Sequence, residues 1–362
     1  MVNSISHFGI GFLIASFLGF KGRERVYLGL IAVIPDLDFI PNIIFFAIED
    51  ALTYELRTQL FYLMVHREFM HSLLFILIIT SILWFWKKNR LFTFTGFLVL
   101  LSHFFLDYAT SWKMRPLYPF INEPSTLGSM YFFDPVISVI SIIPILIFLL
   151  DIKMKNKVDA GKNWLNKIYT YAKKNERLIY NILVVIFVIW CAVTPFAKYM
   201  LVNEVSEIED AKISYQNTYP VSPASFISAY SFNDSHYKIM EISYHSVIKR
   251  SDYVEKITYT DSTYEYLDTD INPYIERAYE LYASNPAQQI DYPVYSVMIN
   301  ESSVTVVIGD ARSKYVRFWA YFVVEYEFVF DRSYPEGKFV AFFRDQQGNE
   351  RKAPDSWFRR NS

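Results

Sequence analysis

The pattern of hydrophobic positions changes part-way along this chain. Long apolar runs dominate the first half, and six of them approach the roughly 20 apolar residues that a bilayer core about 30 Å thick requires. They cover residues 5–20, 26–48, 69–86, 91–106, 131–150 and 178–196. The last two have no charged residue at their centres. We therefore expect an α-helical, multi-pass membrane domain with about six spans.

From about Leu201 onward, apolar residues alternate with polar ones instead. Segments with this period of two, rich in Val, Tyr, Phe and Thr, predict antiparallel strands. They are residues 239–248, 252–259, 295–308, 315–330 and 339–344. A short helix is predicted over 276–282, in a segment that starts near Pro273. We expect a membrane domain over residues 1–199 and a small, β-rich α+β soluble domain over residues 200–362.

Charge divides the chain at the same place. The formal net charge is -2, but residues 1–199 carry +6 and residues 200–362 carry -8. Of the 19 basic residues in the first part, 14 lie in alternate loops, at 21–25, 87–90 and 153–177. Short cytoplasmic loops carry such an excess of Lys and Arg. The prediction is a cell-membrane protein whose N-terminus and C-terminal domain are extracytoplasmic.

Composition and the N-terminal residues narrow the class of protein further. Hydrophobic residues make up 52% of the chain and charged residues 20%, and there is one cysteine, Cys191. These values exclude a disordered chain, a disulfide scaffold and a cysteine-based metal site. No Lys or Arg precedes the first apolar run, so we expect no cleaved signal peptide. Segment 153–177 is expected to lie on anionic lipid rather than to bind nucleic acid.

Several ionisable residues lie within or beside the predicted spans, where such groups are costly and mark candidate functional sites. On the predicted topology they all fall on the outer side of the membrane. They are His7, Asp36, Asp38, His66, His71, His103 and Asp107. Any one of them could instead cap or pack a helix, but seven on one side favour a shared site.

The residue types predict a metal site. His103 and Asp107 are four residues apart and share a helix face, whereas Asp36 and Asp38 stand beside two prolines, which suits a loop. Mixed imidazole and carboxylate ligands suit Zn²⁺, Mn²⁺ or Fe²⁺, and we expect Zn²⁺ first among these divalent transition metals. Seven candidates suffice for a two-metal site of the kind that cleaves phosphoesters.

Other residues could assist. Arg67 and Arg115, the nearest guanidinium groups, could bind an anionic phosphate through paired hydrogen bonds. Either Asp36 or Asp38 could be a ligand or a general base, and the spacing leaves this open. On a regular helix His66 and His71 would point roughly 140° apart, so a helix start or a distortion between them is needed if they are to meet.

These motifs together resemble the YdjM-type membrane-bound metal-dependent hydrolases over roughly residues 1–150. The matching pieces are His7, the Pro-Asp-Leu-Asp segment 35–38, the His-Arg segment with a second His at 66–72, and Ser-His with a following Asp at 102–107. The resemblance implies metal-ligand or catalytic roles for the seven residues above, Asp36 and Asp38 included, with Arg67 assisting. It covers nothing in residues 200–362.

Two functions remain in view. The first is a hydrolase acting at the outer membrane face on a phosphoester or other ester of a lipid-linked substrate. The alternative is a non-enzymatic membrane sensor, regulator or assembly protein with a structural or regulatory metal site. A transporter fits the break at Pro35 but would be expected to show an internal repeat. Partners are therefore the lipid bilayer and a lipid-linked substrate, and the oligomeric state stays open.

Overall fold

The computed structural model describes residues 4–155, 164–260, 269–287, 289–316, 324–344 and 348–359. The chain divides into two compact units, which we describe separately. The first unit contains Met1–Pro41 and His66–Lys198, and the second contains Asn42–Val65 and Tyr199–Ser362. The main division thus falls where the charge and the hydrophobic pattern change. Segment Asn42–Val65, however, belongs with the sheet-rich part of the chain.

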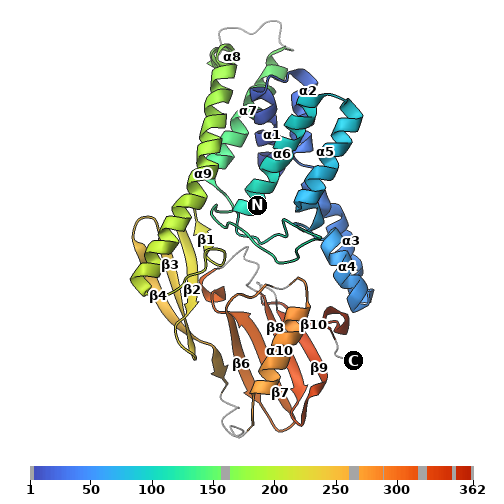
Figure 1. Ribbon diagram of the computed structural model, residues 1–362, viewed down its shortest axis with the longest axis vertical. Helices are drawn as coiled ribbons and strands as arrows, with labels where there is room; N and C mark the ends of the chain where they lie inside the picture. The colour runs from blue at the N-terminus through green and yellow to red at the C-terminus, as the bar shows by residue number, and fades with distance from the viewer. Residues whose placement is uncertain are drawn as a thin grey trace. The chain divides into compact units, whose positions relative to one another are not determined.

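The first unit is helical (Figure 1). Its elements are α1 (Ser4–Phe17), α2 (Gly22–Ile31), the 3-10 turn η1 (Pro35–Asp38), the start of α3 (Phe39–Ile48), η3 (Phe69–His71), α5 (Leu73–Lys87), α6 (Arg90–Ala109), α7 (Pro135–Lys155), α8 (Trp164–Lys174) and the first part of α9 (Glu176–Glu209). Residues 156–163 of the predicted interfacial segment lie outside the described residues, and α8 forms much of the remainder.

Among the described residues, three helices are long and apolar enough to cross a membrane, namely α6, α7 and α9. The number rises to five if two bent pairs each count as one span: Gly22–Ile31 with Pro35–Ala51, bent by 48°, and Tyr54–His71 with Leu73–Lys87, bent by 69°. The predicted six spans are therefore not confirmed. Helix α1 has 14 residues, about 21 Å at 1.5 Å per residue, which is short for a hydrocarbon core.

Helix α1 packs against α2, α6 and α7 and is the centre of the first unit. Close approach depends on small residues, as in many membrane helix pairs. A Cβ atom at Gly9 would lie 2.2 Å from the carbonyl oxygen of Ser141 on α7, and one at Gly11 would lie 2.6 Å from the Cβ of Ala32. Side chains larger than hydrogen at these two positions would force α1 away from its neighbours.

The second unit is rich in sheet, as the alternation predicts. A four-stranded antiparallel sheet has the order β1-β2-β3-β4, and a six-stranded sheet has the order β10-β9-β8-β7-β6-β5, with β5 and β6 parallel. The strands are β1 (Tyr219–Ser222), β2 (Ser225–Ser231), β3 (His236–Ser243), β4 (Val247–Glu255), β5 (Ile257–Tyr259), β6 (Pro293–Ile299), β7 (Ser303–Asp310), β8 (Glu325–Asp331), β9 (Tyr334–Arg344) and β10 (Glu350–Ala353).

Four of the five predicted strand segments take a different form. Segment 239–248 runs from β3 into β4, and segment 252–259 runs from β4 into β5. Segment 295–308 is not one strand but two, β6 and β7, joined by a turn at residues 300–302. Segment 315–330 includes residues 317–323, which lie outside the described residues, and its end forms β8. The predicted short helix is α10 (Asn272–Ser284), with Pro273 in its first turn, where its missing N–H costs nothing.

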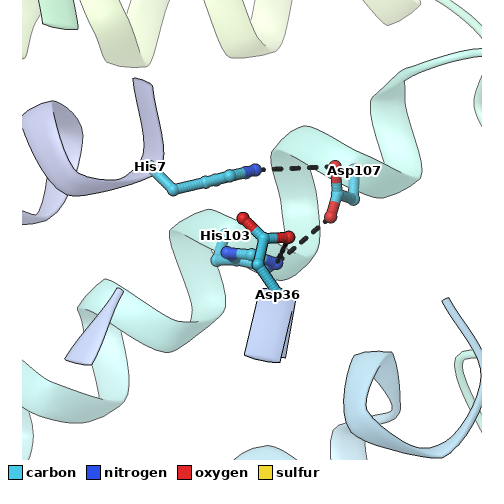
Figure 2. Close-up of side chains that lie close together, drawn as sticks. All are labelled: His7, Asp36, His103 and Asp107. Atoms are coloured by element: carbon cyan, nitrogen blue, oxygen red, sulfur yellow. Dashed lines mark ion pairs between the residues drawn. The ribbon is translucent and has the colours of Figure 1, made fainter. Parts of the chain in front are cut away.

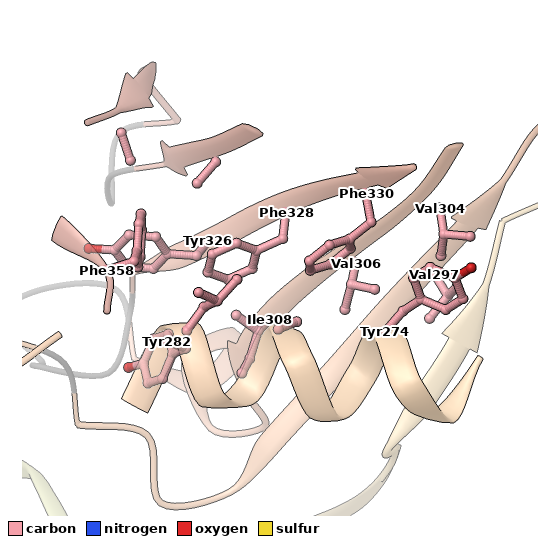
Figure 3. Close-up of a cluster of buried hydrophobic side chains, with 14 of the residues drawn as sticks. Tyr274, Tyr282, Val297, Val304, Val306, Ile308, Tyr326, Phe328, Phe330 and Phe358 are labelled. Atoms are coloured by element: carbon pink, nitrogen blue, oxygen red, sulfur yellow. The ribbon is translucent and has the colours of Figure 1, made fainter. Parts of the chain in front are cut away.

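Helix α10 covers one face of the six-stranded sheet (Figure 3). Alternate residues of β8 point into this core: Tyr326, Phe328 and Phe330 are at most 1% exposed. Tyr274 and Tyr282 reach the same cluster from α10. The period-two pattern that predicted strands is therefore the pattern of one buried sheet face.

Segment Asn42–Val65 carries the rest of α3, η2 (Glu49–Ala51) and α4 (Tyr54–Met64). Its buried Arg57 donates to Glu49 Oε2 at 2.8 Å and to Asn285 Oδ1 at 3.1 Å. Trp357 Nε1 donates to Asp50 Oδ1 at 3.1 Å, and η6 (Asp355–Trp357) packs on α4. These polar contacts are why the segment belongs with the C-terminal part of the chain.

Candidate metal centre

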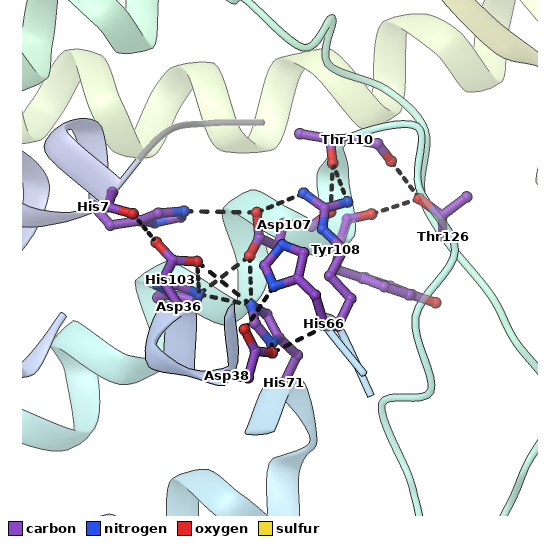
Figure 4. A network of polar contacts seen from close by, with 12 residues as sticks. His7, Asp36, Asp38, His66, His71, His103, Asp107, Tyr108, Thr110 and Thr126 are labelled. Atoms are coloured by element: carbon purple, nitrogen blue, oxygen red, sulfur yellow. Dashed lines mark hydrogen bonds and ion pairs between the residues drawn. The ribbon is translucent and has the colours of Figure 1, made fainter. Parts of the chain in front are cut away.

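All seven predicted ligand residues lie in the first unit, and the structure brings them together (Figure 4). His7 comes from α1, the two aspartates from η1, and His103 and Asp107 from the last turns of α6. His66 and His71 flank the turn between α4 and α5. Four separate stretches of chain therefore supply one cluster.

The chain between His66 and His71 is not a regular helix. Helix α4 ends at Met64, Arg67 has φ of 72°, and η3 begins at Phe69. A positive φ is costly for a residue with a side chain, so the surroundings must hold Arg67 in place. The distortion that the spacing requires is present, and the two imidazole rings meet with centroids 5.1 Å apart.

Four potential ligand atoms converge at the centre of the cluster. His71 Nε2 lies 3.1 Å from His103 Nε2 and 3.0 Å from Asp107 Oδ2, and His103 Nε2 lies 3.1 Å from the same carboxylate oxygen. Asp36 Oδ1 lies 3.8 Å from His71 Nε2 and 3.7 Å from His103 Nε2. Each of these distances between potential ligand atoms is therefore below 4 Å.

The other side of the His103 ring shows which of its nitrogens carries hydrogen. His103 Nδ1 lies 2.7 Å from the carbonyl oxygen of Ala32, which can only accept, so Nδ1 is the donor and Nε2 keeps its lone pair. His71 Nδ1 faces Asp38 Oδ2 at 3.0 Å. Carboxylates and carbonyls commonly hold metal-binding histidines in this way. The lone pair of His103 Nε2 thus faces Asp107 Oδ2, which is another acceptor.

His7 lies at the edge of this group (Figure 2). Its ring stacks on that of His103 with centroids 3.8 Å apart, and its Nε2 is 3.6 Å from Asp107 Oδ1. The residue is 1% exposed, and neither ring nitrogen has a hydrogen-bond partner among the described residues. A buried imidazole without hydrogen bonds is costly, and a metal ion would satisfy it.

The donor set fits a transition metal. Ligands about 2.0–2.1 Å from a tetrahedral Zn²⁺ lie about 3.3 Å from one another, and the measured separations of 3.0–3.8 Å bracket that value. Among the described residues, two groups of side chains bring their candidate ligand atoms within 4.8 Å of one another. They are His7, Asp36, His103 and Asp107, and Asp36, His66 and His71. Asp36 belongs to both groups.

Asp38 is engaged differently from Asp36. Its Oδ1 lies 2.7 Å from His66 Nδ1, and its Oδ2 accepts the backbone N–H of Arg67 at 3.1 Å and faces His71 Nδ1. Asp36 instead accepts the Ser4 hydroxyl at 2.6 Å through Oδ2, which leaves Oδ1 toward the centre. The structure thus separates two aspartates that the sequence could not tell apart.

Both predicted guanidinium groups have carboxylate partners. Arg67 Nη2 donates to Asp107 Oδ1 at 3.0 Å, and Nη1 donates to Thr110 Oγ1 at 3.1 Å. Arg115 pairs with the buried Glu68. Arg67 therefore holds Asp107 in position. Arg115 instead pairs with Glu68, the residue that follows Arg67 in the turn between α4 and α5.

Three contributors were missed by sequence reasoning. Ala32 acts through its backbone carbonyl, so its side chain carries no signal. Ser4 and Thr110 act through hydroxyls. Ser4 is three residues from His7, and Thr110 is three residues from Asp107. This spacing of about one helical turn could have indicated that the two hydroxyls lie near the cluster.

Comparison with known proteins supports the membrane context. The family model described as the YdjM inner membrane protein matches residues 1–200, more than half of the chain. The chain belongs to the YdjM inner membrane protein family. No curated protein and no solved structure matches it. The match includes every residue of the cluster and extends beyond the motifs that first suggested the family.

In this YdjM family member, access to the cluster is uneven. His7, Asp38, His71, His103 and Asp107 are at most 2% exposed. The side chains of His66 and Asp36 are 26% and 13% exposed. A molecule approaching the cluster would therefore meet these two residues first.

Proposed function

We propose that this protein is a membrane-bound, metal-dependent hydrolase that acts at the outer membrane face. The substrate would be a phosphoester or another ester of a lipid-linked molecule. The supporting observation is the convergence of two imidazole nitrogens and two carboxylate oxygens, with the opposite nitrogen of each ring already next to an acceptor. Such acceptors repel one another unless a cation lies among them.

The ligands in this proposal are His71, His103, Asp107 and Asp36, with His7 beside them. Asp38 orients His71 and His66, and Arg67 holds Asp107. A bound Zn²⁺, or Mn²⁺ or Fe²⁺ in its place, would lower the pKa of a water to about 7 and stabilise developing negative charge. Asp36 also belongs to the group with His66 and His71, and these three residues would hold a second ion.

His66 is the chain's own candidate for proton transfer. It is the most exposed member of the cluster, and its Nδ1 is held by Asp38 at 2.7 Å. Nε2 would then hold or release the proton at the accessible edge of the site, as imidazoles oriented by a carboxylate do in other hydrolases. The sequence left the general base open between Asp36 and Asp38. In this proposal His66 takes that role, and Asp38 orients it.

The orientation in the membrane is part of the proposal. Basic loops on alternate sides of the spans support an extracytoplasmic cluster and C-terminal domain. Protease added to intact cells should then cleave within that domain, and complete protection would contradict the outward orientation.

Metal analysis of the detergent-purified protein is the direct test. We expect at least one transition-metal ion per chain in the wild type, with hydrolysis of a phosphoester. His103→Ala and Asp107→Ala should each abolish both metal and turnover while the protein still elutes as one folded species. The matched control is Asp134→Ala, since Asp134 is a buried aspartate of the same unit that caps α7. A metal-free wild type would refute the proposal.

One observation favours a second function. Five of the seven cluster residues are almost completely buried, as in structural metal sites that are closed to substrate. A sensor, regulator or assembly protein would bind metal with the same ligands but turn over no phosphoester, lipid or peptide. Purification from membranes with one stoichiometric partner, together with bound metal and no turnover, would establish this alternative.

A further inference from the structure

An apolar groove of about 590 Å³ lies between three helices of the first unit. Helix α1 contributes Ile14 and Phe17, α6 contributes Leu101 and Phe105, and α9 contributes Phe187 and Cys191, among others. The volume is in the range of pockets that hold small ligands. Lining residues with large exposed fractions, such as Phe17 at 45% and Val188 at 58%, show that the groove is open on one side.

The lining selects an apolar occupant. Ser102 is the one hydroxyl-bearing residue in the lining, which contains no charged residue. The Ser102 hydroxyl already donates to the carbonyl oxygen of Val99 at 2.7 Å. Apolar cavities of this kind stay dry and take up hydrocarbons. Two of the three walls, α6 and α9, are candidate membrane spans, so the open side faces lipid chains rather than water.

The groove and the metal centre are built on the same two helices. Ile14 follows His7 by seven positions on α1, which places the two residues on one face of the helix about 10 Å apart. On α6, Leu101 and Phe105 alternate with His103 and Asp107, so one face lines the groove and the other holds ligands. A chain in the groove would therefore end close to the level of the metal centre.

We infer that this groove binds one long hydrocarbon chain of the lipid substrate and thereby makes the enzyme select amphipathic esters by tail length. The inference rests on the proposed hydrolase function for its catalytic consequence, but the binding itself is measurable alone. Contacts between the hydrocarbon and the groove walls add up along the chain, so affinity rises with chain length until the groove is full.

Binding is tested first, with hexadecyl phosphate as the probe. Native mass spectrometry of wild-type protein released from phosphatidylcholine nanodiscs should show one retained hexadecyl phosphate, and butyl phosphate should not be retained. Ala192→Phe and Leu101→Trp, which fill the groove from α9 and α6, should each lose the retained molecule.

Matched controls place the same side chains outside the groove. Val185→Phe on α9 and Phe94→Trp on α6 change residues that are more than half exposed and absent from the lining. Both controls should retain hexadecyl phosphate like the wild type. Equal retention in filled and control variants would overturn the inference, as would retention of butyl phosphate to the same extent.

Turnover is the second measurement. Water cleaves the phosphate ester, the alkyl oxygen leaves with hexadecanol or butanol, and inorganic phosphate is released. We expect Ala192→Phe to lower kcat/KM for hexadecyl phosphate roughly tenfold, mainly through KM, because that factor corresponds to only about 1.4 kcal/mol of lost contacts with the groove walls. The same variant should hydrolyse butyl phosphate within about twofold of wild type, because uniform binding to the tail is all that is lost.

The outcomes separate the two proposals. Retention of hexadecyl phosphate with no hydrolysis of either ester supports the groove and refutes the hydrolase. Hydrolysis of both esters with equal kcat/KM supports the hydrolase and refutes the groove. Unchanged thermal unfolding of the filled variants shows that a lost signal comes from the groove itself.

Discussion

Two buried polar networks, one in each unit, differ in how their donors and acceptors balance. In the second unit, Arg312 is fully buried and donates to Asp310, Asp291 and the carbonyl of Asn217 at 2.6–2.8 Å. Asp310 also accepts the backbone N–H groups of Asp291 and Tyr292. The network is complete within the protein. In the first unit, by contrast, neither ring nitrogen of His7 has a hydrogen-bond partner among the described residues, and the lone pair of His103 Nε2 faces the acceptor Asp107 Oδ2.

This difference distinguishes a network that stabilises the fold from a cluster that is a candidate functional site. A buried network in which charges and hydrogen bonds are satisfied needs nothing further and stabilises one fold. A buried cluster with surplus acceptors has a cost that only a proton or a metal ion removes. The same residue types, a carboxylate beside a cationic or imidazole group, therefore carry opposite meanings in the two units.

The largest expected effect comes from breaking the balanced network. Arg312→Ala leaves Asp310 buried without its cation, and removal of one partner of a buried pair costs about 3–5 kcal/mol. Denaturant unfolding of the full-length protein should show this loss. Metal content should stay at the wild-type value. Loss of less than about 1 kcal/mol would show that Arg312 is not essential to the second unit.

Metal removal should destabilise the first unit. With free metal at about 100 times its Kd, binding stabilises the folded protein by about 2.7 kcal/mol, and a chelator removes that contribution. Hydrogen exchange should then accelerate in η1 and at the end of α6 and stay unchanged in β7 and β8. Equal acceleration in both units, or in neither, would contradict the assignment of the surplus acceptors to a metal ion.

A smaller effect is expected from the orienting aspartate. Asp38→Asn keeps the size of the side chain but weakens the contact to His71 Nδ1, and loss of such a contact typically lowers metal affinity 10–100-fold. Competition with a fluorescent zinc chelator measures the change. The corresponding change in the second unit, Asp310→Asn, should leave metal affinity unaltered. An unchanged affinity in Asp38→Asn would make Asp38 a bystander.

The smallest effect should come from an ordinary capping residue of the first unit. Asp134 Oδ1 accepts the Ile137 N–H at 2.9 Å, and Oδ2 accepts Trp190 Nε1 at 3.1 Å. Asp134→Ala should cost about 1 kcal/mol, the usual loss of a helix cap, measured as a shift in thermal unfolding. Metal content should not change. A metal-free Asp134→Ala protein would show that metal loss reports general damage rather than a lost ligand.

Much of the cluster was predictable because it follows from local chemistry. Imidazoles and carboxylates are rare at membrane depth, so His103 and Asp107 stood out within an apolar run without any knowledge of their neighbours. Spacing of four on one helix then paired them, and the structure places their atoms 3.1 Å apart. The strands of the second unit were predictable for a similar reason, since burial of one sheet face imposes a period of two.

Other features depended on chain folding over long separations. The role of Arg67 as the partner of Asp107 joins residues 40 positions apart, and the orientation of His103 depends on the carbonyl of Ala32, 71 positions away. Likewise, Arg57 meets Asn285 across 228 positions, which assigns segment Asn42–Val65 to the second unit. No local periodicity encodes such contacts.

The sequence by itself indicated the membrane character, a change of pattern near residue 199 and seven candidate ligands, because hydrophobicity, charge and residue type act over short stretches of chain. Tertiary structure decided which aspartate faces the centre, which arginine holds a ligand, and where an apolar groove runs between α1, α6 and α9. These outcomes depend on where side chains end in space, and only the packing of distant segments determines that.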